Sequence, residues 1–174
     1  MVSLTHKRQH PAAVHCPEGN VGMPNRFVHP RFCLQQGDTN TSLTKYSRMI
    51  PLNPEDARAY GGRGIAYLNM GNYRRRSRYV SAWRRCCFDN AITDFTTAIR
   101  LAPKDASLYL WRGIAFKARG QFDEAIADLA EAIRLEPKGP RAYVERSIVH
   151  QQKGEMGEAV ADSARADHLA MSLW

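Results

Sequence analysis

Apolar and aromatic residues recur at helical spacing along most of this chain. Tyr60 and Tyr67 lie seven residues apart, as do Tyr109 and Phe116, which places each pair on one face of a helix. Prolines and glycines punctuate these segments, and no stretch alternates with the two-residue period of a β-strand. The pattern predicts an all-α chain of alternating first and second helices, with the aromatic pairs in the core.

The helical pattern repeats with a fixed period. Ala91, Ala125 and Ala159 are spaced by 34 residues. Upstream, equivalent residues such as Pro54 and Pro103 are 49 apart, so one repeat carries an insertion of 15 residues. Helix–turn–helix units of this length bury a core only by stacking on their neighbours.

The residues in phase resemble the tetratricopeptide repeat family over residues 57–174. Small residues let paired helices approach to about 8 to 10 Å, and glycines at 71, 120 and 154 are predicted to end the first helices. The resemblance implies an all-α helix–turn–helix solenoid of about three repeats with a degenerate N-terminal half-repeat, acting as a non-catalytic protein-interaction scaffold. The residues that carry it are Gly64, Ala91, Pro103, Gly113, Ala125, Pro137 and Ala159.

The chain divides into three predicted parts. Residues 1–38 contain four prolines and are expected to form an irregular arm. Residues 39–56 are expected to form the half-repeat, with one helix from Asn40 to Met49, because Pro30 would interrupt an earlier helix. Residues 57–174 form the array, divided into 57–105 with the insertion at about 73–87, then 106–139 and 140–174.

First helices line the concave surface in this family, and their spacing here predicts an apolar floor with a basic rim. Such a groove suits an extended or helical peptide with apolar anchors and an acidic residue. The alternative is that the isoleucines of the floor only pack between repeats. The candidate residues are Arg58, Gly61, Ile65, Leu110, Ile114, Lys117, Arg141, Val144 and Ile148.

One partner known for the family is not expected. Members that hold the acidic tail of heat-shock chaperones use Lys, Asn and Arg on their first helices. The matching positions here are Gly61, Ile65, Trp111, Arg141 and Glu145, so only Arg141 retains the required charge-assisted donor.

Arginines and aspartates also recur in phase. Since a residue present in every unit is most simply structural, we expect an Arg–Asp ladder between paired helices, although the arginines could instead reach the groove. The two rows are Arg63, Arg112 and Arg146, and Asp94, Asp128 and Asp162.

The net charge of +8 is concentrated in the insertion. Residues 57–72 and 89–174 hold 13 basic and 13 acidic residues, whereas residues 73–88 hold six arginines and no acid. With Tyr79 and Trp83 among them, the arginines could bind nucleic acid or another anionic ligand. Alternatively, the insertion is a solvated loop, or sequence foreign to the repeat through a recent insertion or a faulty gene model. Part of it is also expected to extend the second helix backwards. The arginines are Arg74, Arg75, Arg76, Arg78, Arg84 and Arg85.

Cysteine usage and the termini favour a cytoplasmic protein. The N-terminus lacks the apolar run of a signal peptide or membrane span, and four cysteines form no disulfide framework, so reduced thiols are expected. At the other end, Met171, Leu173 and Trp174 are expected to fold back on the last helices or to mediate self-association.

Metal, cofactor and catalytic chemistry are not expected. The cluster of His15, Cys16, His29 and Cys33 lacks the paired spacing of a zinc site. Arginines beside Cys86 and Cys87 could lower thiol pKa values, but no general base is positioned for catalysis. No phosphate-binding loop or nucleophile motif is present.

Overall fold

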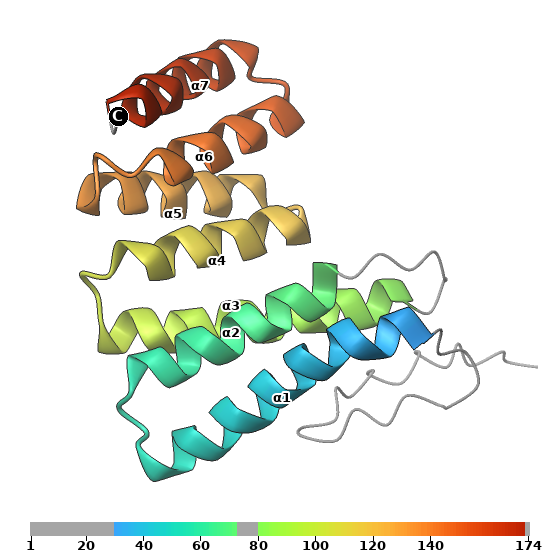
Figure 1. Cartoon of the computed structure of the whole chain (residues 1–174). Helices are drawn as coiled ribbons and strands as arrows, with labels where there is room; N and C mark the ends of the chain where they lie inside the picture. Colours follow the sequence, from blue (N-terminus) through green and yellow to red (C-terminus); the bar gives the residue numbers. More distant parts are fainter. Residues whose placement is uncertain (1–29, 73–79, 173–174) are drawn as a thin grey trace, which may run out of the picture.

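The structure, a computed structural model, describes residues 30–72 and 80–172, with side chains from Thr39 to Asn72 and from Trp83 to Ser172. These residues form seven helices that pack consecutively as a stack, with α1 and α7 at its two ends (Figure 1). The predicted all-α array is confirmed. The helices are α1 (Pro30–Leu52), α2 (Ala57–Asn72), α3 (Val80–Leu101), α4 (Ala106–Arg119), α5 (Phe122–Leu135), α6 (Pro140–Lys153) and α7 (Met156–Met171).

The three repeats are the helix pairs α2–α3, α4–α5 and α6–α7. Local sequence sets their ends. The Asp105 carboxylate caps α4 by accepting a hydrogen bond from the Ser107 backbone N–H at 3.0 Å. Gly120 and Gly154 end the first helices α4 and α6 with φ of 81° and 88°, which strains any other residue.

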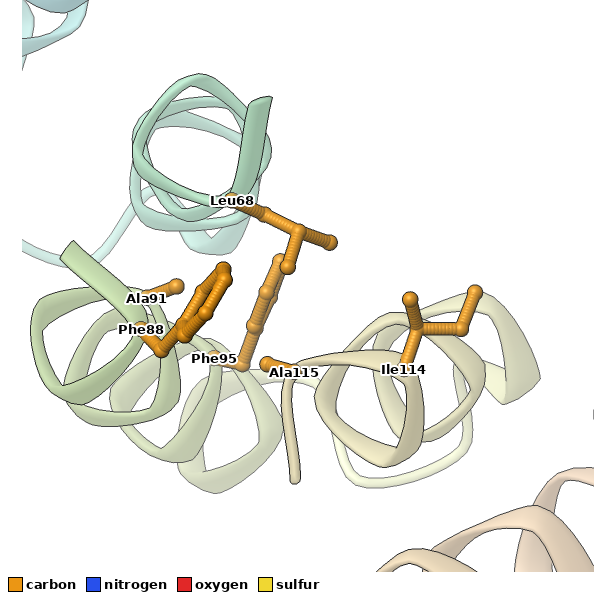
Figure 2. Packing of buried hydrophobic residues seen from close by; sticks show 6 residues of the cluster. All are labelled: Leu68, Phe88, Ala91, Phe95, Ile114 and Ala115. Atoms are coloured by element: carbon orange, nitrogen blue, oxygen red, sulfur yellow. The ribbon is translucent and has the colours of Figure 1, made fainter. Parts of the chain in front are cut away.

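Small residues lie where paired helices approach most closely. A Cβ on Gly64 would lie 2.8 Å from the Phe95 ring, and one on Gly113 would lie 2.9 Å from the Leu129 side chain. Phe95 is fully buried, with Leu68 of α2 on one side and α4 on the other (Figure 2). The packing predicted for these small positions is therefore confirmed.

Gly71 does not end its helix, as the sequence predicted. It is buried inside α2, which continues to Asn72, and a Cβ there would overlap the Phe88 ring of α3. The prediction is wrong because Gly71 is a packing position inside α2. Close packing explains why a glycine occupies this position.

The helix of the half-repeat is longer than expected. It begins at Pro30, so the predicted start at Asn40, and an irregular backbone over residues 30–38, are wrong. Proline is compatible with the first turn of a helix, where its missing N–H has no intrahelical acceptor. A helix over residues 30–38 is therefore compatible with Pro30 in its first described turn.

The insertion continues the fold in part. α3 has 22 residues against 14 in α5, because it begins at Val80 and thus extends the second helix backwards. Cys87 is buried in a cluster with Leu43 of α1 and Met70 of α2, and Trp83 packs against that cluster. Helical extension is therefore confirmed for residues 80–87, while residues 73–79 lie outside the described part of the chain.

At the other end of the stack, Met171 is 78% exposed and does not fold back onto the last helices. Leu173 and Trp174, the other residues of that prediction, lie outside the described residues.

Candidate peptide-binding face

Each repeat contains one Arg–Asp pair that links its two helices. The arginine on the first helix donates two hydrogen bonds to the aspartate on the second, at 2.7–2.8 Å. All three carboxylates are buried. The predicted ladder is confirmed, and these guanidinium groups are held within the repeats rather than directed to a ligand. The pairs are Arg63–Asp94, Arg112–Asp128 and Arg146–Asp162.

The arginine and aspartate side chains of the ladder are half-buried or buried, so the interaction between their charges is screened little by water. The hydrogen bonds from Arg63 to Asp94 raise the pKa of the Arg63 guanidinium above its ordinary value, against the opposing effect of burial. Burial in turn raises the pKa of Asp94, and Arg63 opposes that rise. The arginine is therefore what allows an ionised aspartate at 4% exposure.

Two residues of the predicted groove floor belong to the core. Gly61 is buried, and a Cβ there would lie 3.1 Å from Leu108 of the neighbouring first helix. Ile114 is buried in the cluster that joins α2, α3 and α4. For these two positions the alternative, packing between repeats, is correct, and Ile65 and Leu110 also pack against this cluster.

The other floor residues remain partly accessible on the surface that α2, α4 and α6 share. Their side chains are half-buried, except that of Val144, which is 43% exposed. α2 contacts α4 and α4 contacts α6, so one surface runs along the array. We call it the first-helix face, and it comprises Ile65, Leu110, Trp111, Val144 and Ile148.

Two polar contacts tie α4 to α6 across this face. The Arg141 guanidinium stacks on the Trp111 ring, 4.4 Å from its centroid, and the Lys117 ammonium forms an ion pair with the Glu145 carboxylate. The predicted basic rim is thus reduced, since Lys117 is neutralised, and Arg58 is exposed beyond the start of the face.

The spacing of these residues in the sequence accounts for their pairing. Trp111 and Arg141 are 30 residues apart, and Lys117 and Glu145 are 28 apart, which is one repeat less one or two helical turns. Residues at that separation meet across adjacent first helices. The sequence-based prediction named these residues without pairing them, although the spacing was the available signal.

A pocket of about 230 Å³ lies between α1 and α2 at the N-terminal end of the first-helix face. Ile65 lines both the pocket and the face. The pocket carries hydroxyl and amide groups but no charged side chain, so it suits a neutral group of a partner. Its lining residues are Thr39, Ser42, Tyr46, Gly62, Ile65, Ala66 and Asn69.

The described part of the insertion uses its side chains for packing. Arg84 donates from Nε to the Gly71 carbonyl oxygen at 2.9 Å and lies over the Phe88 ring. Trp83 is half-buried, while Arg85 is exposed. The other arginines, Arg74, Arg75, Arg76 and Arg78, lie outside the described residues.

The adjacent cysteines differ from expectation. Burial raises the pKa of the Cys87 thiol to about 12, so the arginines beside it do not activate it. Cys86 is disulfide-bonded, which contradicts the expectation of reduced thiols at this position.

Over residues 39–72 and 83–172 the structure places no three metal-ligating side chains together. The side chains of His15, Cys16, His29 and Cys33 fall outside this part of the chain. None of the helices in the described segments is sufficiently long and apolar to cross a membrane.

Comparison with known proteins supports the class indicated by this geometry. A family model for the tetratricopeptide repeat matches residues 115–154. Among solved structures, TTC0263, a thermophilic tetratricopeptide protein of Thermus thermophilus, is similar with 25% identity and a TM-score of 0.69, over 80% of this chain and 70% of that one. No curated protein matches the chain.

Two further structures are similar. The tetratricopeptide domain of Arabidopsis OM64 has 27% identity and a TM-score of 0.56, over 70% of this chain and 88% of that one. A double mutant of MamA RS-1 has a TM-score of 0.65 over 82% of this chain and 72% of that one, and its 17% identity shows the fold alone. The matches thus show a tetratricopeptide repeat at residues 115–154 and a tetratricopeptide-like array for the described helices.

Proteins of this class are generally protein-interaction scaffolds, and no catalytic family is found among the matches. The class thus implies protein partners, without identifying one.

Proposed function

We propose that this chain is a non-catalytic scaffold that binds a peptide or partner segment along the first-helix face. The observation that carries the proposal is the partly apolar surface of α2, α4 and α6, in which two polar contacts join α4 to α6. Trp111 and Arg141 hold adjacent helices together, and Val144 is exposed beside them. A surface fixed before binding loses less conformational entropy when a partner docks.

The first-helix face suggests the chemistry of the partner segment. Half-buried Ile65, Leu110 and Ile148 offer contacts for apolar anchors. The Arg141 guanidinium, stacked on Trp111, also offers N–H donors to the carboxylate of an acidic residue. The chaperone-tail clamp remains disfavoured, because Trp111 and Glu145 of its matching positions are engaged with Arg141 and Lys117.

A selected peptide tests the proposal. Random peptides would be selected on the full chain, and the affinity of a labelled winner measured by fluorescence anisotropy. Val144→Glu should weaken binding by roughly tenfold or more, since it places a charge at an apolar contact. Ala127→Glu, an equal charge change at an exposed position of the second helix α5, should leave the affinity unchanged. Equal affinities for both variants would refute the proposal.

Nucleic-acid or anionic-ligand binding through the insertion is the competing function. Of the groups it requires, Trp83 and Arg84 are engaged in packing. Salt dependence separates the two functions, because phosphate contacts give a steep loss of affinity with rising salt and an apolar face gives a weak one.

The proposed location is cytoplasmic, and the disulfide bond at Cys86 is the feature that bears against it. Disulfides persist mainly in oxidising compartments. Thiol labelling in intact cells followed by mass spectrometry decides the matter: a reactive Cys86 supports the cytoplasm, and a blocked Cys86 excludes it.

A further inference from the structure

The pocket between α1 and α2 lies where the repeat pattern is incomplete. α1 follows the phase of a second helix, 49 residues before α3, and packs on α2 at one end of the stack (Figure 1). Among the described residues, no first helix precedes α1 to pair with it. The equivalent positions one repeat later show what fills this place in a complete repeat.

One repeat later, a first helix covers the equivalent place. In Figure 2, Leu68 of α2 covers a cluster that residues of α3 and α4 form. Most of the pocket is lined by the residues 49 positions before that cluster. The pocket is therefore the counterpart of the site in which α2 lies. The equivalent residues are Thr39 and Phe88, Ser42 and Ala91, Tyr46 and Phe95, Ile65 and Ile114, and Ala66 and Ala115.

The charge beside the pocket is opposite to that of its counterparts. Lys45 stands 49 residues before Asp94, at the position of the ladder aspartates. Its ammonium lies 5.8 Å from the centroid of the Tyr46 ring, which lines the pocket. Lys45 is exposed and has no ion-pair partner within residues 39–72 and 83–172. Since each ladder aspartate faces an arginine of its first helix, a helix docked beside Lys45 would instead need an acidic residue there.

We propose that the pocket binds a helix of a partner protein, which serves as the first helix for α1. Its contact face carries an acidic residue, a small residue next to it and a large apolar residue four positions further on, in the spacing of Arg63, Gly64 and Leu68. The small residue is needed because second helices press a large side chain against this position, as Phe95 does against Gly64. Helix-in-groove binding of this kind leaves the first-helix face free.

The chain itself does not supply a matching helix. The positions 49 residues before the three that define the pattern hold Val14, His15 and Gly19, with Pro17 between them. They provide neither the acidic nor the large apolar residue, and a proline inside a helix costs about 3 kcal/mol. The first helices of a second copy carry an arginine at the acidic position, which Lys45 would repel. These mismatches favour a helix from a different protein.

A synthetic helical peptide tests the proposal. The probe has the sequence of residues 57–72 with Arg63→Glu. A hydrocarbon staple joins positions 58 and 62, because Arg58 is exposed and Gly62 faces α1 in the array. Fluorescence anisotropy with the full chain measures the affinity. The acidic peptide should bind roughly tenfold or more tightly than the same peptide with Arg63 retained, since the arginine would face Lys45.

A charge reversal in the chain locates the binding site. Lys45→Glu should reverse the preference between the two peptides. Arg48→Glu is the matched control and should leave the preference unchanged, because Arg48 is also exposed on α1 but lies on the opposite side of the helix from Thr39.

The outcomes separate this proposal from binding at the first-helix face. Val144→Glu, which alters only that face, should leave the affinity for the acidic peptide unchanged. A chain that binds neither peptide, or both equally, overturns the proposal. A preference that Lys45→Glu leaves unchanged, that Arg48→Glu also reverses, or that disappears with Val144→Glu overturns it as well.

Discussion

Removing one arginine from the ladder gives a sharp test of what holds the repeats together. Arg63 donates two hydrogen bonds of 2.8 Å to Asp94, which is only 4% exposed. Arg63→Met keeps much of the side-chain stem but leaves the buried carboxylate without these donors. Because a buried charge that loses its partner is strongly destabilising, we expect the free energy of unfolding to fall by about 3 kcal/mol at pH 7.

The loss should shrink in acid. Burial raises the pKa of Asp94 and Arg63 opposes the rise, so removing Arg63 leaves the raising cause alone. When the pKa of a carboxyl group is higher in the folded state than in the unfolded state, the folded protein is relatively most stable at a pH below the unfolded-state pKa. This stability is lost as the pH rises through the folded-state pKa. The folded variant can avoid an unpaired buried charge by protonating Asp94, so the cost of that protonation is an upper limit on the loss of stability from the charge. With an unfolded pKa near 3.9, this limit is about 4 kcal/mol at pH 7 and about 1.5 kcal/mol at pH 5.

Urea unfolding followed by tryptophan fluorescence at both pH values measures these changes. Arg134→Met is the control, because Arg134 pairs with Glu131 on the exposed surface of α5 and should change stability little. Arg63→Met with Asp94→Leu should recover most of the loss, since an apolar pair can replace a buried ion pair. A penalty independent of pH, or a double variant as unstable as the single one, would refute the reasoning.

Three further predictions concern single residues. Gly71→Ala places a methyl group against an aromatic ring of α3 and should cost about 1 to 3 kcal/mol in thermal or urea unfolding, whereas Gly157→Ala, into open space, should be neutral or stabilising. Hydrogen bonds from Lys153 and a histidine lower the pKa of Glu155, so the stability that ionised Glu155 contributes to the fold is lost as the pH falls below about 4.5. Glu155→Gln should therefore reduce the fall in the free energy of unfolding that is measured between neutral and acid pH. Cys87, with a pKa of about 12, should resist thiol reagents at pH 8 until the chain unfolds; rapid labelling of the native chain would contradict its burial.

Periodicity predicted those features that depend on residues one repeat apart. The Arg–Asp ladder could be inferred from recurrence, because a charged residue present in every unit needs an equally recurrent partner. Gly120 and Gly71 mark the limit of this logic. They share a phase, yet Gly120 has a φ of 81° at a helix end and Gly71 packs inside α2. The insertion follows Gly71 in the sequence and has no counterpart after Gly120, so the same residue serves two different roles.

The candidate face was harder to predict because periodicity indicates on which side of a helix a residue lies, but not whether its side chain is buried. Gly61 and Leu110 occupy equivalent positions, yet Gly61 is buried because its missing side chain admits Leu108 of α4. Val144, also equivalent, is exposed on α6. Exposure along one row thus depends on which neighbour each helix meets, and a single sequence does not specify that.

The insertion and the half-repeat support each other. α1 lacks a first helix of its own kind among the described residues, and its Leu43 packs instead into a cluster with Met70 and Cys87. Cys87 lies in the extension of α3, and Trp83, one turn earlier, packs against the same cluster. Deleting the insertion would therefore uncover Leu43 as well as remove the extension, so its loss should destabilise α1 before it affects α4–α7. The arginines that first suggest a ligand site thus lie on a segment whose described half already has a structural role.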